Sequence, residues 1–187
     1  MSNKTTETRL MNKAIHYLGR YSASEQRLRI ILDRFASKKL ADTDQTEVAS
    51  AIKNVVEKCL RIGYVDNAAF AETLARSQRR QGKSSMLIQQ KLRQHALDDT
   101  AIATALDMVD ANHHNAELAA AIHFARRRRL GPFSRNVAEE RERHRHLRSL
   151  ARAGFSMEIC RTVLNATSVN DLEGLERDAM HADGAGW

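Results

Sequence analysis

The sequence predicts an all-α protein, built as an elongated tandem array of three degenerate three-helix repeats. Three observations favour this fold class. The 187-residue chain has a single proline, Pro132, and is rich in residues that lose little side-chain entropy in a helix. Its apolar residues recur at helical spacing, and no stretch alternates apolar and polar residues long enough for a strand. The chain also resembles itself when it is shifted by about 60 residues.

Nine helices are expected from the apolar spacing. In one of them, Val48, Ile52, Val55 and Cys59 share a single helix face. The expected ranges are 9–20, 24–36, 45–62, 67–80, 84–95, 99–110, 114–129, 134–152 and 157–166.

Polar residues and glycine mark the ends of these helices. Ser22 and Glu25 have the spacing of a capping box, and Asp98 is expected to cap a later helix. Gly63 follows the third helix where a left-handed C-terminal cap is typical, and Asp66 is expected to cap the next helix.

Internal repetition sets the predicted organisation, because residues aligned by shifts of 58 or 60 keep their type. A unit of 50 to 60 residues buries too little surface to be stable alone, so three stacked units share their apolar faces. Aligned pairs include Leu92 with Leu150, Ala96 with Gly154, Asp98 with Ser156, Leu28 with Ile88 and Ser24 with Ser84. The expected repeats are 9–62, 63–110 and 113–166, followed by an acidic, flexible tail over 167–187.

The charge distribution indicates an anionic partner. The formal net charge is +7 and the sequence pI is about 9.8. Between Arg76 and Arg93 the chain has six Lys or Arg and no acid available for pairing, whereas 166–187 has five acids and only Arg177 as a base. Nucleic acid is the simplest partner for such a protein. A membrane surface is disfavoured because no helix sets a strong apolar face against a basic one.

Two groups of basic residues are the candidate partner- or nucleic-acid-binding residues. For any single arginine, a solvated position is the simpler interpretation, with Glu139, Glu140 and Glu142 pairing some of them locally. For the group, binding is favoured, because four successive guanidinium groups repel one another and must cover more than one helix face. The first basic set is Arg76, Arg79, Arg80, Lys83, Lys91 and Arg93; the second basic set is Arg126, Arg127, Arg128, Arg129, Arg135, Arg145, Arg148 and Arg152.

The sequence offers no convincing catalytic or metal-binding constellation. The segment 82–84 matches the end of a phosphate-binding loop, but Ser77 stands where that loop needs glycine, and a helix precedes it. Two histidine pairs, at 113–114 and 144–146, have spacings that point to different helix faces, so we interpret these histidines as solvated residues on a basic face. We therefore expect no enzymatic activity, no cofactor, no metal and no small-molecule substrate.

Other features predict burial and a cytoplasmic location. Cys59 and Cys160 fall at apolar positions and are expected to be buried thiols. Tyr64, Phe124 and Phe133 lie near basic residues, but core positions are expected rather than base stacking. The polar N-terminus lacks a signal-peptide core, and no apolar run is long enough to span a bilayer.

A nine-residue segment carries a family resemblance. Residues 63–71 read GYVDNAAFA, which resembles the Gly-Tyr-Leu-Asp-Asp-x-x-Phe-Ala motif of the RecX family, regulators of the RecA recombinase. The similarity covers roughly residues 10–166. Val65 replaces the usual leucine, Asn67 replaces the second acid, and Ala96 stands where a Lys-Gly turn is common. The arginine run 126–129 is unusual for the family.

The resemblance implies a negative regulator of RecA. Family members bind in the groove of the RecA–DNA filament, block its extension, and so lower its ATPase, strand-exchange and coprotease activities. The implied partners are the RecA filament and, weakly and without sequence specificity, single- and double-stranded DNA. Gly63, Tyr64, Asp66 and Phe70 would then fix the turn between repeats, and the arginines would contact RecA or DNA.

Two other functions remain open from the sequence. One is a sequence-tolerant DNA-binding helical protein without a RecA role. The other is a helical adaptor that contacts only acidic protein surfaces. A helix-turn-helix repressor is less favoured, because no short helix pair shows that motif.

Overall fold

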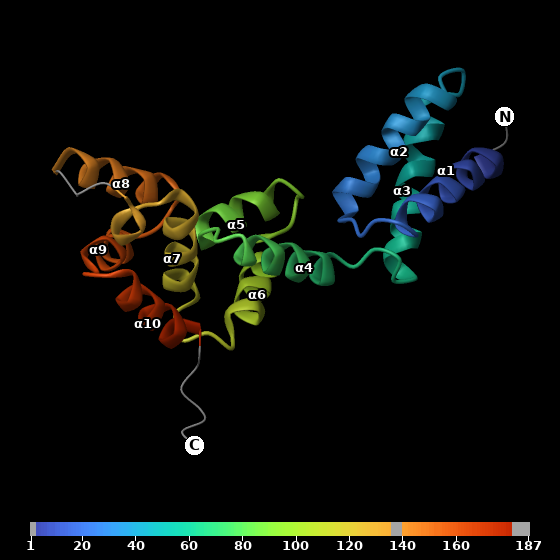
Figure 1. Ribbon diagram of the computed structural model, residues 1–187. Helices are drawn as coiled ribbons and strands as arrows, with labels where there is room; N and C mark the ends of the chain where they lie inside the picture. Colours follow the sequence, from blue (N-terminus) through green and yellow to red (C-terminus); the bar gives the residue numbers. More distant parts are fainter. Residues whose placement is uncertain (1–2, 136–139, 181–187) are drawn as a thin grey trace. The chain divides into compact units, whose positions relative to one another are not determined.

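Helices make up all the regular secondary structure in the described part of the chain. The computed structural model describes residues 3–135 and 140–180, so the all-α prediction is confirmed there (Figure 1). The elements are α1 (Asn3–Leu18), α2 (Glu25–Lys39), α3 (Gln45–Arg61), α4 (Asn67–Arg80), α5 (Ser85–Arg93), α6 (Asp99–Asp110), α7 (Ala116–Arg128), the 3-10 helix η1 (Gly131–Phe133), α8 (Glu140–Arg152), α9 (Met157–Asn165) and α10 (Val169–Met180).

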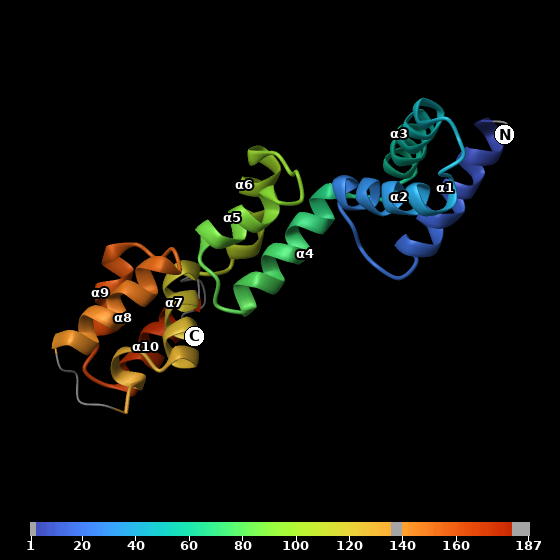
Figure 2. The same ribbon diagram turned by 90° about the horizontal axis from the view of Figure 1, so that it is seen from above.

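Helix α10 corrects the prediction of a flexible tail over 167–187. Residues Val169–Met180 are helical, and Figures 1 and 2 both show α10 beside α7. Leu172 and Ala179 on its apolar face are buried. The Ser168 hydroxyl accepts from the Asp171 N–H at 3.1 Å, while the Asp171 carboxylate accepts from the Ser168 N–H at 3.1 Å. This is a capping box that the acidity of the segment obscured. The rest of the predicted tail, 181–187, lies outside the described residues.

Smaller differences concern where helices begin. Helix α1 starts at Asn3 rather than at residue 9. The helix expected over 134–152 does not begin at Ser134, which ends η1, and α8 is described from Glu140. Ser24, not Ser22, caps α2, and its hydroxyl accepts from the Arg27 N–H at 3.2 Å.

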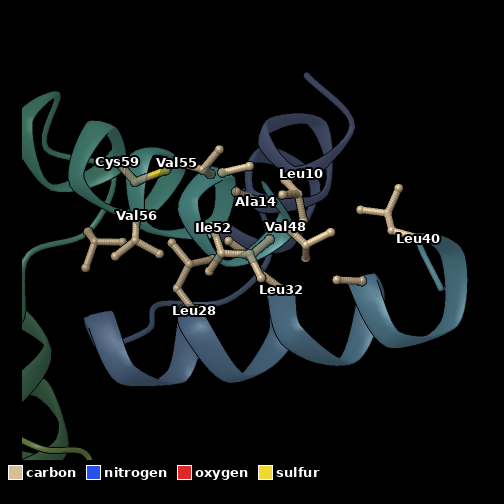
Figure 3. Packing of buried hydrophobic residues seen from close by; sticks show 13 residues of the cluster. Leu10, Ala14, Leu28, Leu32, Leu40, Val48, Ile52, Val55, Val56 and Cys59 are labelled. Atoms are coloured by element: carbon tan, nitrogen blue, oxygen red, sulfur yellow. The ribbon is translucent and has the colours of Figure 1, made fainter. Parts of the chain in front are cut away.

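The first three helices enclose an apolar core of their own. Leu10 from α1, Leu28 and Leu32 from α2, and Val55 and other residues from α3 point toward one another (Figure 3). Each of these four side chains is fully buried. Burying such side chains is worth about 1.5–3 kcal/mol each, which is the main stabilisation of this three-helix group.

A second core lies among the last four helices. Ile122 and Ala125 from α7, Leu150 from α8, Val163 from α9 and Leu172 from α10 are all fully buried in it. Contacts divide the chain into two compact units, one comprising 1–71 and 93–101 and the other 72–92 and 102–187.

Residues that the self-alignment pairs adopt the same local structure. The hydroxyls of Ser24 and Ser84 both cap a helix by accepting from the N–H three residues later. Asp98 and Ser156, another aligned pair, do the same for Ala101 and Ile159. Equivalent caps at equivalent positions are what descent from a repeated unit predicts.

The aligned pair Ala96 and Gly154 also shares its backbone conformation. Their φ angles are 54° and 86°, both in the left-handed region that favours glycine. At Gly154 the close packing adds a second constraint, because a Cβ atom would lie 2.6 Å from the Ser84 Oγ. The Ser84 hydroxyl donates to the Ala153 carbonyl at 2.6 Å, so this turn is held directly against the start of α5.

Candidate partner and nucleic-acid interface

The glycine-tyrosine motif forms the turn between α3 and α4. Gly63 has φ 74°, and the Tyr64 N–H donates to the Cys59 carbonyl at 2.9 Å. The Asp66 carboxylate caps α4 by accepting from the Ala69 N–H at 2.9 Å. These contacts agree with a structural role for the motif.

Two aromatic side chains of the motif, Phe70 and Tyr64, differ in their packing. Phe70 packs edge-on against the His95 ring, with centroids 4.9 Å apart. The Tyr64 side chain is 54% exposed, so the expectation that it occupies a core position is wrong. Asn67, which replaces an acid of the motif, accepts from the Glu25 N–H at 2.9 Å and thereby ties α4 to the start of α2.

Arg79 of the first basic set is buried and not available to a partner. Its side chain is only 8% exposed, and it forms ion pairs with Asp110 and with Glu117, the latter at 2.7 Å. The same guanidinium donates to the Lys83 carbonyl at 3.0 Å and the Ser85 hydroxyl at 2.7 Å. Burial acts to lower the pKa of Arg79, but Asp110 and Glu117 outweigh it and hold the pKa above its usual value.

The expectation that the first basic set lacks acids for pairing is also wrong. Arg76 pairs with Glu72 one helical turn away, and Arg93 pairs with Asp99 at 2.9 Å. Acids just outside the segment, or far from it in sequence, supply the partners. The other three members are placed at the surface: Arg80 and Lys91 are exposed and Lys83 is half-buried.

Arg126 and Arg127 of the second basic set are engaged within the fold. The Arg126 guanidinium contacts the Glu176 carboxylate at 2.6 Å and lies 5.2 Å from the centroid of the Phe133 ring. Arg127 is exposed and donates to the Gln81 carbonyl at 2.9 Å. Helix α10 therefore neutralises one arginine of the run.

Five other arginines of the second basic set line one pocket of about 530 Å³, which we name the arginine cleft. They come from the end of α7, from the residue two positions after η1, and from α8. The cleft is lined by Arg128, Arg129, Arg135, Arg145 and Arg152, together with Leu130, Ser134, His146 and Ser149.

Backbone geometry at the end of α7 shapes this cleft. Arg129 adopts φ 56° as the left-handed cap of α7, and its N–H bonds to the last turn of the helix. Leu130 is buried, and the Gly131 N–H donates to Nδ1 of His146 on α8 at 3.1 Å. These contacts hold the start of η1 against α8.

His146 is neutral in this arrangement, because its Nδ1 acts as an acceptor. Burial lowers the pKa of His146, while Glu142 opposes the shift and Arg145 adds to it. The prediction that His146 is a solvated residue on a basic face is wrong, since the residue is 5% exposed.

Arg148, the last member of the second basic set, does not line the cleft. It lines a neighbouring hollow with Arg141 and the cleft residue Arg145, and its Nε donates to the His144 carbonyl at 3.3 Å. The two cleft arginines of α8, Arg145 and Arg152, were both predicted as candidates, and with Ser149 they share one helix face.

The described residues offer few other functional arrangements. Cys59 and Cys160 are buried free thiols, as expected, and burial raises the pKa of both. In the described ranges, His, Cys, Asp and Glu side chains form no group of three or more suited to a metal ion. No helix within those ranges has the length and apolar character that crossing a membrane requires.

The fold and the cleft together define a class of protein. In its described residues it is an all-helical protein with repeated caps and turns, in which five arginines line one pocket. Comparisons with known proteins identify a family within this class. A family model described as "RecX, second three-helix domain" matches residues 66–106.

Two relatives that align with nearly the whole chain share the name regulatory protein RecX. The chain is 36% identical over 166 residues to the regulatory protein RecX of Myxococcus xanthus, covering 87% of this chain and 88% of the relative. It is 30% identical over 168 residues to the regulatory protein RecX of Agrobacterium fabrum, covering 90% and 88%. The chain belongs to the RecX family of regulatory proteins.

Solved structures agree at the level of the fold. The crystal structure of RecX from Lactobacillus salivarius has a TM-score of 0.67 at 17% sequence identity, covering 91% of this chain and 98% of that one. A second crystal structure of regulatory protein RecX also has a TM-score of 0.67, at 20% identity, covering 88% and 74%.

Proposed function

We propose that this protein is a negative regulator of the RecA recombinase, which binds the groove of the RecA–DNA filament and blocks its extension. Blocking extension would lower the ATPase, strand-exchange and coprotease activities of the filament. The protein acts by binding and carries out no reaction of its own. The observation that carries this proposal is the 36% identity to a RecX regulatory protein over most of both chains.

The mechanism combines several weak contacts. The repeats, proposed to be 9–62, 63–110 and 113–166, would each contact the filament at a successive RecA subunit. Linked contacts raise the effective concentration of each, so that individually weak surfaces give a tight overall hold. The match of the second three-helix domain model to 66–106 supports the middle repeat.

The two basic sets have different parts in this proposal. Arg79 and Arg126 stabilise the fold, since acids of the same chain pair with them. Exposed Arg80, Lys91 and Arg148, together with the arginine cleft, remain as candidate contacts to RecA or DNA. Gly63, Asp66 and Phe70 would fix the turn between the first two repeats.

Co-sedimentation with preformed filaments tests the proposal. RecA filaments assembled on single-stranded DNA with a non-hydrolysable ATP analogue should carry the protein into the pellet, on any DNA sequence. The same DNA without RecA is the control and should retain less protein at 150 mM salt, because phosphate contacts alone weaken with salt. Equal retention on bare DNA and on filaments would contradict a RecA-directed role.

A second candidate function is DNA binding without a RecA role. The arginine cleft favours it, because a cleft lined by five arginines suits phosphates whether or not RecA is present. Under this function the protein would bind single-stranded and duplex DNA with equal affinity and would leave filament growth unchanged.

A further inference from the structure

We propose that the arginine cleft binds the sugar–phosphate backbone of a nucleic-acid strand and does not read its bases. The inference rests on the proposed function for its choice of nucleic acid as the partner. It goes further by assigning contact with DNA to one surface of the chain, formed by the end of α7 and by α8.

Three of the cleft arginines carry positive charge that no described acid compensates. Arg129, Arg135 and Arg152 have no acid partner among the described residues, and all three are exposed. No acidic side chain of the described residues lines the cleft. By contrast, acids of the chain pair with Arg79 and Arg126. An anionic ligand in the cleft would not compete with a described acid for Arg129, Arg135 or Arg152.

The other two cleft arginines are oriented by contacts with neighbouring side chains. Arg128 lies over the Phe124 ring, 5.8 Å from its centroid. Arg145 pairs with Glu142 at 2.6 Å, and 67% of the Arg145 side chain stays exposed. These contacts orient the side chains at the cleft without removing them from a ligand.

The types of lining residue point to phosphate. Guanidinium groups donate two parallel hydrogen bonds to phosphate oxygens, and the hydroxyls of Ser134 and Ser149 lie in the same wall. No Phe, Tyr or Trp side chain of the described residues lines the cleft, although stacking on such rings is the usual way in which proteins hold single-stranded bases. The arrangement therefore suits a chain of phosphates and is indifferent to the bases attached to it.

An abasic oligonucleotide tests this directly. The full-length protein is titrated at 50 mM salt against a fluorescent oligo-dT and against an abasic strand of the same length, with anisotropy as the readout. Equal affinities are expected, because the phosphates are the same. Stacking of even one base would make the abasic strand bind at least about five-fold more weakly, and that result would overturn the proposal.

Matched double variants locate the binding to the cleft. R129A with R152A removes two cleft charges, and R34A with R61A removes two exposed charges, from α2 and α3, that do not line the cleft. The cleft variant should lose about ten-fold or more in affinity. The steepness of its plot of log binding constant against log salt concentration should fall by about 1.4, because each phosphate contact contributes about 0.7 on single strands. The control variant should keep the slope of the unmodified protein. Equal losses in the two variants would indicate a long-range charge effect and overturn the proposal.

Two further measurements separate the sources of phosphate and the two levels of the hypothesis. Inorganic tripolyphosphate should compete only at concentrations far above those of oligo-dT phosphates; tight tripolyphosphate binding that R129A with R152A abolishes, with DNA binding unchanged, would reassign the cleft to a free oligophosphate.

If the unmodified protein leaves RecA filaments unaffected but the cleft variant loses DNA binding, the proposed function fails and the cleft assignment stands. If the protein does block filaments and the cleft variant binds DNA normally, only the cleft assignment fails.

Discussion

A single buried arginine joins four helices of the second unit. Arg79 on α4 contacts Asp110 at the end of α6, Glu117 at the start of α7 and Ser85 at the start of α5. Two carboxylates and two oxygen acceptors satisfy its guanidinium, which offsets the cost of burying the charge. The residue therefore stabilises the packing of these helices rather than binding a partner.

Replacing Arg79 should destabilise the second unit strongly. Arg79→Met leaves Asp110 and Glu117 partly buried without a counter-charge, and we expect a loss of about 3 kcal/mol in the free energy of unfolding. Arg76→Met is the matched control on the same helix; its half-exposed pair with Glu72 should be worth less than about 0.5 kcal/mol. Urea denaturation measures both, and similar losses in the two variants would show that Arg79 has no special structural role.

His146 makes the stability of the protein depend on pH. Its folded-state pKa is lowered, so the neutral form contributes stability above the unfolded pKa of about 6.5, and this contribution is lost as the pH falls through the folded pKa. His146→Asn keeps an acceptor for the Gly131 N–H but cannot titrate. The melting temperature of the unmodified protein should therefore fall more between pH 7.5 and pH 5 than that of the variant. Parallel pH profiles would exclude this role.

In the turn between α5 and α6, the residue type at position 96 does not suit the backbone conformation. Ala96 occupies a left-handed conformation, with φ 54°, at the position aligned with Gly154. A Cβ atom is strained there by about 1–2 kcal/mol. The family pattern, in which a Lys-Gly turn is common at this position, reflects the same requirement.

Ala96→Gly should stabilise the protein. Relief of the left-handed strain outweighs the extra entropy of glycine in the unfolded chain, and we expect a gain of about 0.5–1 kcal/mol. Ala103→Gly, at an exposed position inside α6, should instead cost about 1 kcal/mol. Thermal unfolding of both variants compares them, and a loss of stability in Ala96→Gly would contradict the strain.

Helix α10 is part of the core of the second unit and not an appendage. We expect Leu172→Ala to cost about 2–5 kcal/mol, because Leu172 is fully buried among residues of the second core. Met180→Ala, at a residue that is 49% exposed in the same helix, should cost under about 1 kcal/mol. Chemical denaturation measures both; a negligible loss in Leu172→Ala would mean that α10 does not support this core.

The sequence predicted most helices because helical periodicity is a local property. Helix α3 follows the pattern of Val48, Ile52 and Val55 within one residue of its predicted end. Helix α10 was missed because its acidic residues suggested a solvated tail, although Leu172, Leu175 and Ala179 have helical spacing. Ser168 and Asp171 also have the spacing of a capping box in the sequence.

Ion pairs were predicted less well because their partners lie far apart in sequence. Arg79 and Glu117 are 38 positions apart, and Arg126 and Glu176 are 50 apart. A charge pattern read along the chain cannot find such pairs without knowing how the helices pack. The self-alignment succeeded at longer range because corresponding residues repeat the same local caps and turns.

We propose that the chain as a whole regulates RecA by binding its filament. Steady-state ATP hydrolysis by RecA on single-stranded DNA measures this most directly, because hydrolysis requires assembled filament. With the protein in stoichiometric excess over RecA, the rate should fall progressively as filaments fail to extend, whatever the DNA sequence. An ATPase rate that the protein leaves unchanged at this excess would contradict the claim.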